Sequence, residues 1–229
     1  MAQTLERPPR AGRLRGAPRA LLAWVRSAPG TYLWLLVLAV TSFVVARTDP
    51  RTLDWFLAAR STNLEQLSSR PVHALVGSAL WTETSGWPVY AVLFTVFHAN
   101  AERWLGTARW FTVAATAHVL ATLVSEGVVA WGIVRGTAQR SMADTVDVGV
   151  SYALAGVVAV LAHRFAGGWR WLYGGGVVVC YLVPLVVSHT FTDLGHFTAA
   201  LIGLCFFPFA HGRPHWDPGR ALRRRRSRR

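Results

Sequence analysis

A serine and a histidine occupy similar positions at the starts of two apolar segments of the 229-residue sequence. Ser151 lies four residues after Asp147, and His196 lies three residues after Asp193. With a helical rise of 1.5 Å per residue, both side chains would lie roughly 5–8 Å below the beginnings of their segments. A serine hydroxyl and a neutral imidazole at one depth can act as nucleophile and general base. We therefore expect a Ser151–His196 dyad if the two helices are neighbours.

Small residues accompany both members of this pair. They allow two helix backbones to approach closely, which a serine–histidine hydrogen bond of about 3 Å requires. The small residues are Gly149, Ala153 and Gly156 in the first segment, and Gly195, Ala199, Ala200 and Gly203 in the second. A serine between membrane helices can also simply bond a backbone carbonyl, and the spacing alone leaves that alternative open.

The composition indicates a membrane protein. Hydrophobic residues make up 52% of the chain and charged residues only 15%, well below the usual quarter of a soluble domain. The 24 basic residues are all arginine and cluster near the two ends of the chain. Because these ends adjoin apolar segments, we expect them to set the topology and to contact anionic lipid headgroups, with no nucleic-acid partner.

Six apolar segments predict an all-α polytopic membrane protein. The expected spans are 31–46, 87–100, 109–134, 147–165, 171–188 and 193–210. The apolar stretch 71–81 is too short to cross roughly 30 Å of hydrocarbon, so we expect it to dip into the membrane from the first outer loop. The corresponding organisation is a basic cytoplasmic segment (1–28), a membrane domain (29–211) and an arginine-rich cytoplasmic tail (212–229).

The distribution of arginine predicts which side each end occupies. Cytoplasmic loops of membrane proteins carry an excess of arginine, and both ends of this chain are rich in it. Both termini on one side require an even number of spans, which agrees with six. We therefore expect a multi-pass protein of the cell membrane with both termini in the cytoplasm.

Metal chemistry is a less favoured alternative. A zinc-dependent hydrolase would activate water through a ligand set that the sequence offers as His118, Glu126, His189 and His196. No two histidines are spaced as a compact pair on one helix. Cys180 and Cys205 form no Cys-x-x-Cys pair and are expected to be buried thiols. We therefore expect neither a metal nor a cofactor.

Three stretches in this order resemble the rhomboid superfamily of intramembrane proteins. They are "AERWLGTARWF" (101–111), "GVSY" (149–152) and "GHFTAALIG" (195–203), and the likeness covers roughly residues 30–210. A divergent actinobacterial group of rhomboid-like proteins is the most similar. The resemblance implies a six-transmembrane-helix rhomboid-like bundle and a serine protease that cleaves membrane-embedded substrates. Ser151 would be its nucleophile and His196 its general base, without cofactor or metal.

Two departures from the rhomboid pattern point to a second function. Tyr152 replaces the glycine that normally follows the serine of the Gly-x-Ser-Gly motif, in which Gly149 is the first glycine. The His-x-x-x-Asn pair that supports the oxyanion would fall near Gly86 and Tyr90. Tyr90 and the Ser151 amide would then be the remaining oxyanion donors. The alternative is a rhomboid-like protein that binds transmembrane clients without cleaving them.

The imidazole of the dyad also needs a group that holds it in place. Asp147 and Asp193 are expected at the entrance of the site rather than behind the ring of His196. We therefore predict a dyad without an orienting carboxylate, in which Tyr152 or another aromatic ring packs against His196.

Overall fold

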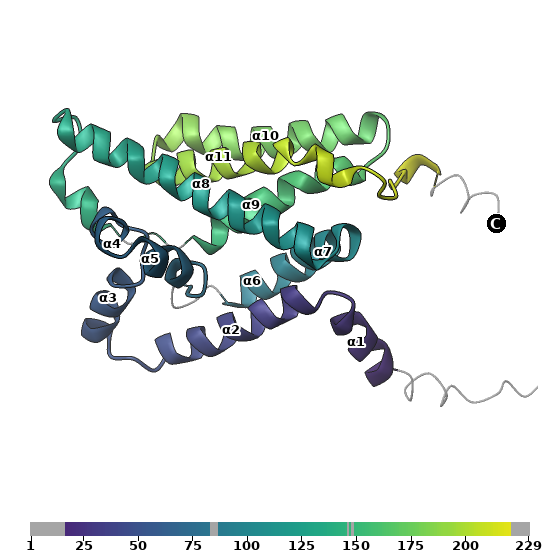
Figure 1. The fold of residues 1–229 in the computed structure, drawn as a ribbon, viewed down its shortest axis with the longest axis horizontal. Coiled ribbons are helices and arrows are strands. Elements are labelled where there is room, and N and C mark those ends of the chain that lie inside the picture. The colour runs from purple at the N-terminus through teal and green to yellow at the C-terminus, as the bar shows by residue number, and fades with distance from the viewer. Residues whose placement is uncertain (1–16, 83–86, 146, 148, 221–229) are drawn as a thin grey trace, which may run out of the picture.

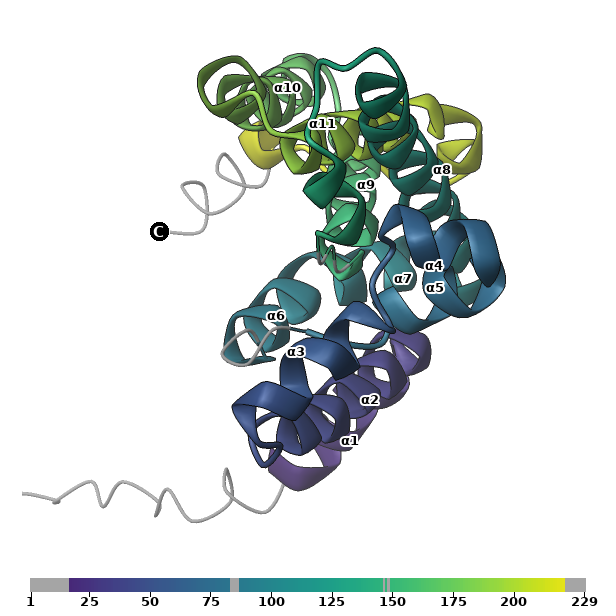
Figure 2. The same cartoon turned by 90° about the vertical axis from the view of Figure 1, so that its left-hand side faces the viewer.

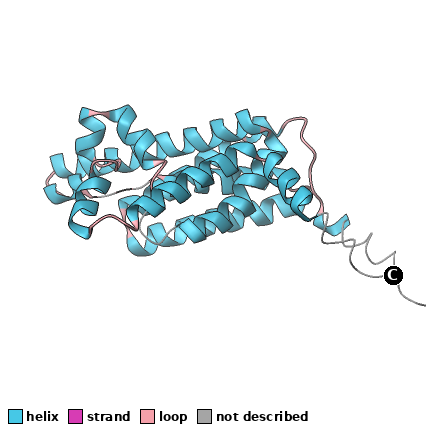
Figure 3. Cartoon of the chain, turned by 90° about the horizontal axis from the view of Figure 1, so that it is seen from below, coloured by secondary structure: helices cyan, strands magenta, loops and turns pink. Residues whose placement is uncertain are grey.

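The computed structural model describes residues 17–82, 87–145, 147 and 149–220. Most of the basic amino-terminal segment, Gly86 and the end of the arginine-rich tail lie outside the described residues. In the described part of the chain, all the secondary-structure elements are helices (Figure 3). One isolated β-bridge joins Phe165 and Trp216. The all-α prediction is confirmed for this part of the chain.

The described helices follow the predicted order. The first half contains α1 (Ala17–Arg26), α2 (Pro29–Val45), α3 (Pro50–Ala58), α4 (Leu64–Ser69) and α5 (Pro71–Ser78). A helical stretch then runs from α6 (Trp87–Leu93) through a π-helical turn η2 (Phe94–His98) into α7 (Ala99–Leu105). The second half contains α8 (Thr107–Val134), η3 (Arg140–Asp144), α9 (Val150–Val160), η4 (Leu161–Arg164), α10 (Gly168–Ser188), α11 (Phe191–Cys205) and η5 (Phe207–Ala210). Each of the six predicted spans therefore overlaps a helix.

Three helices form the centre of the bundle. α8, α9 and α11 make the most extensive contacts with one another, and α10 packs mainly on α11 (Figures 1 and 2). α2 and α6 lie to one side. We call the end that carries α1 and η5 the terminal end, and the end that carries α3, α4 and α5 the loop end (Figure 1). α9 and α11 both begin at the loop end, so their first turns lie near each other.

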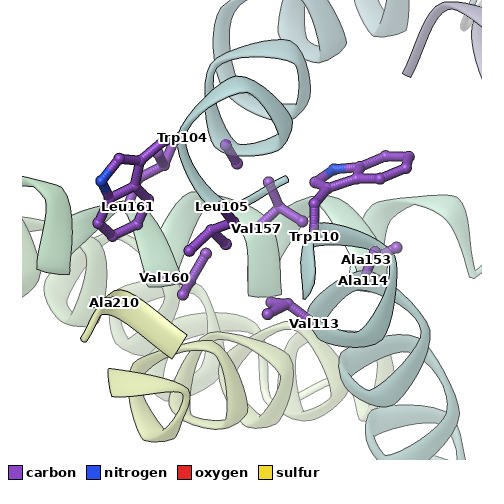
Figure 4. Close-up of a cluster of buried hydrophobic side chains, with 11 residues drawn as sticks. Trp104, Leu105, Trp110, Val113, Ala114, Ala153, Val157, Val160, Leu161 and Ala210 are labelled. Carbon is purple, nitrogen blue, oxygen red and sulfur yellow. The ribbon is translucent and has the colours of Figure 1, made fainter. Parts of the chain in front are cut away.

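A buried apolar cluster joins α7, α8 and α9 (Figure 4). Trp104 and Leu105 of α7 and Trp110 of α8 pack with Val157 and Val160 of α9. All five side chains are buried. This cluster positions α9, which carries the serine.

Glycines allow α9 and α11 to cross with their backbones in contact. A Cβ atom added to Gly203 would lie 2.1 Å from the carbonyl oxygen of Gly156. A Cβ atom added to Gly156 would lie 2.3 Å from the Cβ atom of Ala117 in α8. The predicted close approach through small residues is confirmed, and it extends to all three central helices.

A buried carboxylate fixes the start of α2 against α7 and α8. Glu102 accepts hydrogen bonds from the amides of Gly30 and Thr31 at 2.9 and 2.7 Å. It also accepts from the hydroxyls of Thr31 and Thr107 at 2.7 and 2.8 Å. The first amides of a helix lack partners within the helix, and Glu102 supplies them with one. This interaction gives the "AERWLG" motif a structural role.

The stretch 71–81 forms a short helix that does not cross the bundle. α5 has eight residues, and the carbonyls after it bond to α2, since Trp34 Nε1 donates to Ala79 at 2.8 Å and Thr41 Oγ1 donates to Leu80 at 2.8 Å. Eight residues extend only about 12 Å as a helix. This length agrees with an element that cannot span a bilayer.

Only some of the described helices are long and apolar enough to span a membrane by themselves. α8 and α10 are long and apolar enough, and the pair α1 and α2 qualifies together although the two are bent by 98°. α9 with η4, and α11, are apolar but shorter. The apolar helices indicate a membrane protein, while the count of six spans stays a prediction.

α8 and α10 differ in how they are surrounded. In the most apolar part of α8, 44% of the residues are buried, whereas in α10 the share is 6%. Val177 is the one residue of α10 that is buried. The expectation of buried thiols is wrong, because Cys180 of α10 and Cys205 of α11 are exposed on the surface of the helices.

Candidate functional site

A polar loop fixes the entry into α9. Asp147 donates its amide to Ser61 Oγ at 2.7 Å, and its carbonyl accepts from the Thr62 amide at 3.1 Å. Asn63 caps the following helix α4 by accepting from the Gln66 amide at 2.9 Å. The bonds from Ser61 and Thr62 to Asp147 join segments more than eighty residues apart. Sequence reasoning missed this contact, because a Ser-Thr-Asn run is typical of a helix cap and indicates no distant partner.

His118 of α8 contacts both α5 and the start of α9. Its Nε2 donates to the carbonyl of Leu75 in α5 at 2.9 Å, because a carbonyl can only accept. A Cβ atom added to Gly149 would lie 1.9 Å from His118 Cε1. Gly149 is therefore required by the close approach of this imidazole to the start of α9.

Two tyrosine rings enclose the imidazole of His196. The ring centroids of Tyr152 and His196 lie 5.1 Å apart in an edge-to-face arrangement, and that of Tyr181 lies 6.1 Å from His196. A Cβ atom added to Gly195 would lie 2.5 Å from Cζ of Tyr152. The predicted aromatic packing against His196 is confirmed, with Tyr181 as a second ring.

One of the two aspartates differs from the prediction that both stand at the entrance. Asp147 is buried, and its Oδ2 accepts from the hydroxyl of Tyr152 at 2.7 Å. It therefore orients the ring that packs on His196, rather than lying open to solvent. Asp193 is half-buried and engages Thr190, whose Oγ1 accepts from the Asp193 amide at 3.1 Å as a helix cap.

Ser151 is connected to His196 through its neighbour in the chain. Tyr152, the next residue after the serine, touches both His196 and Gly195. Ser151 and His196 are both partly exposed. Within the described part of the chain, no hydrogen bond joins the Ser151 hydroxyl to the imidazole. Catalytic contacts of this kind are often long in the absence of substrate.

Ser151 shares a helix face with Ala155 and Val158, since positions i, i+4 and i+7 of a helix lie on one face. Ala155 packs in a buried cluster with Ala117 of α8 and Ala199 of α11. Val158 packs against the α2–α6 cluster and against a second cluster that joins α9, α10 and α11. This face of α9 therefore borders the neighbouring helices on both sides.

Of the two positions considered for the oxyanion, Tyr90 lies near the first turns of α9. Tyr90 packs against Phe94 with ring centroids 6.1 Å apart, in the cluster that includes Val150 and Leu154. Val150 directly precedes Ser151. Gly86 lies outside the described residues.

The alternative zinc site does not assemble. In residues 17–82, 87–145, 147 and 149–220, no three His, Cys, Asp or Glu side chains are arranged to hold a metal ion. His118 is bonded to Leu75, and His189 is exposed at the end of α10. These placements separate the four side chains that the sequence offered.

Comparison with known proteins gives the family. A family model described as "Rhomboid-like protein" matches residues 23–216, which is most of the chain. The chain belongs to the rhomboid-like family. No curated protein and no solved structure matches it. The superfamily predicted from the three motifs is confirmed, while the likeness to an actinobacterial group stays an expectation.

The motifs of this rhomboid-like protein have separate roles in the structure. Glu102 of the first motif anchors α2, Gly149 of the second receives His118, and Gly203 of the third allows α11 to cross α9. Ser151 and His196 take part in none of these three contacts.

Proposed function

We propose that this rhomboid-like protein is an intramembrane serine protease that hydrolyses peptide bonds of membrane-embedded substrates. The observation that supports the proposal is that Tyr152, the neighbour of Ser151 in α9, packs against the imidazole of His196, while the backbones of α9 and α11 are in contact. The family membership supports a rhomboid-type function. The partner would be a transmembrane segment of another protein.

The proposed reaction is acyl transfer to water. His196 accepts the proton of the Ser151 hydroxyl as the oxygen attacks the scissile carbonyl. The imidazolium then donates that proton to the leaving amine, and water hydrolyses the acyl-enzyme with the same base. The Ser151 amide and the hydroxyl of Tyr90 are the proposed donors to the oxyanion. Tyr152, fixed by Asp147, holds the imidazole while it changes charge.

The first prediction concerns reaction with a serine-directed fluorophosphonate. We expect the purified protein to be labelled at Ser151, and Ser151→Ala and His196→Ala to reduce labelling to background, since the hydroxyl is weakly nucleophilic without its base. Ser188→Ala removes an exposed serine at the end of α10 and is the matched control, which should label like the wild type. Mass spectrometry of the labelled peptide identifies the site.

A second candidate function is client binding without cleavage. Tyr152 occupies the position where the family has glycine, and the described structure has no hydrogen bond between Ser151 and His196. A wild-type protein that is folded but never labelled, together with a Ser151→Ala variant that still co-purifies with a transmembrane client, would favour this function over proteolysis.

The second prediction concerns topology. We propose six spans in the cell membrane, with both termini in the cytoplasm and anionic lipids at the arginine-rich ends. A reporter fused after Arg229 should be active only in the cytoplasm, and one inserted at Gly136, between α8 and η3, only outside. A reporter after Arg229 that is active outside would contradict the even number of spans.

A further inference from the structure

A cationic cavity of about 310 Å³ lies between η4, the start of α10 and the segment that follows η5. The start of α9, which carries Ser151, contributes no residue to it. Its polar lining consists of His163, Arg170, His211 and His215, and no carboxylate lines it. By volume it can hold roughly ten water molecules, which is sufficient for a phosphate group.

One donor in this group has no partner. The Nε atom of Arg170 is buried and makes no hydrogen bond in the described structure. A buried donor of a charged side chain is costly to leave unpaired, so an acceptor there would be strongly favoured. Arg170 also lies in the first turn of α10, where the helix dipole adds positive potential.

Two of the three histidines are available as donors. His163 Nε2 already donates to the carbonyl of Leu204 at 2.8 Å, so Nδ1 of its neutral ring is an acceptor. His211 and His215 are exposed, and each can turn a ring N–H toward a ligand in the cavity. The carboxylate of Asp217, two residues beyond His215, pairs with Arg220 at 3.3 Å. The nearest acidic group on this segment is therefore already engaged with another arginine.

The wall that carries His211 and His215 is held firmly. The Trp216 amide donates to the backbone carbonyl of Arg164 at 2.7 Å, and the Trp216 carbonyl accepts from the Ala166 amide at 3.0 Å. Trp104 Nε1 donates to the carbonyl of Pro214 at 2.9 Å. Gly212 turns the chain with a φ of 72°, a conformation that a side chain would strain. These contacts keep the two histidines on the cavity without a ligand.

We infer that this cavity binds a phosphate group, carried either by an anionic lipid headgroup or by a soluble phosphate. Convergent arginine and histidine donors without an acidic neighbour match the chemistry of a phosphate, and a guanidinium can bind two of its oxygens at once. The site is separate from the proposed proteolytic site and does not depend on it.

The test measures phosphate binding by the full chain, purified in detergent and freed of lipid. Native mass spectrometry counts retained dioleoyl phosphatidic acid, with dioleoyl phosphatidylcholine as the neutral reference, and inorganic phosphate is added as the second probe. We expect Arg170→Gln to weaken binding about tenfold or more, because a charge-assisted hydrogen bond is lost. Arg140→Gln removes the same charge from an exposed side chain of η3 that does not line the cavity, and should change binding by less than about twofold.

Two arms distinguish the sources of the phosphate. If the binding of phosphatidic acid depends on Arg170 and inorganic phosphate does not displace it, the ligand is a lipid headgroup. If inorganic phosphate binds with the same dependence on Arg170, the ligand is a soluble phosphate. His215→Gln is a second variant for the case in which Arg170→Gln does not fold. Equal binding by wild type, Arg170→Gln and His215→Gln, or binding of neither probe, would overturn the inference.

Discussion

Gly203→Leu is expected to prevent the bundle from assembling. Even a single added Cβ atom would lie 2.1 Å from the carbonyl oxygen of Gly156, a backbone atom that no rotamer change can move away. α11 would have to separate from α9 by about 1 Å for alanine and further for leucine. Overpacking of this kind costs typically about 1–3 kcal/mol for small insertions and more for larger ones.

The measurement is the fraction of monodisperse protein that survives heating in detergent, followed by size-exclusion chromatography. We expect Gly203→Ala to lower the midpoint temperature and Gly203→Leu to give no folded fraction. Gly176→Leu is the matched control, since nothing lies within 4 Å of a Cβ atom at this position of α10. A Gly203→Leu protein as stable as Gly176→Leu would show that the two backbones are not in contact.

The second large effect is expected at Glu102. Glu102→Ala removes the acceptor of four hydrogen bonds. The Gly30 and Thr31 amides at the start of α2 then lose their hydrogen-bond acceptor. Each buried donor that is left without its acceptor typically costs about 1–3 kcal/mol. We therefore expect a strong fall in thermal stability, and a smaller fall for Glu102→Gln, which retains one carbonyl oxygen.

Glu65→Ala is the control for this experiment. Glu65 is an exposed carboxylate in the first turn of α4, where an acidic side chain contributes only about 0.3–1 kcal/mol through the helix dipole. The same heating assay compares the two positions. If Glu102→Ala and Glu65→Ala lose equal stability, Glu102 does not anchor α2.

Much of the fold followed from patterns that depend on neighbours in the sequence. Apolar runs placed the helices, and small residues at helical spacing indicated that α9 and α11 approach closely, as Gly156 and Gly203 do. The short stretch 71–81 was recognised from its length alone. Each of these inferences needs only the dimensions of a helix and of a bilayer.

The support of the site depended on contacts between distant segments, and the sequence could not show them. Nothing near Asp147 indicated that Ser61 and Thr62 would bury its backbone, so its carboxylate was expected at the entrance. The role of His118 likewise depends on Leu75, more than forty residues earlier. Tyr152 is the intermediate case, because adjacency to Ser151 suggested the ring contact with His196 but not the bond to Asp147.

The contrast between α8 and α10 has a consequence for how this gene can diverge. α10 has one buried residue, Val177, so an exchange of one aliphatic side chain for another along most of its length opens no cavity and breaks no contact. At these aliphatic positions, selection can maintain only the average hydropathy that lipid demands, whereas Tyr181 and Arg170 have specific contacts to keep. α8, with Ala117 fitted against Gly156, is constrained in shape where it faces the other helices. In related genes, common descent should therefore be readable in α8 long after the aliphatic positions of α10 have become indistinguishable from those of any other membrane helix.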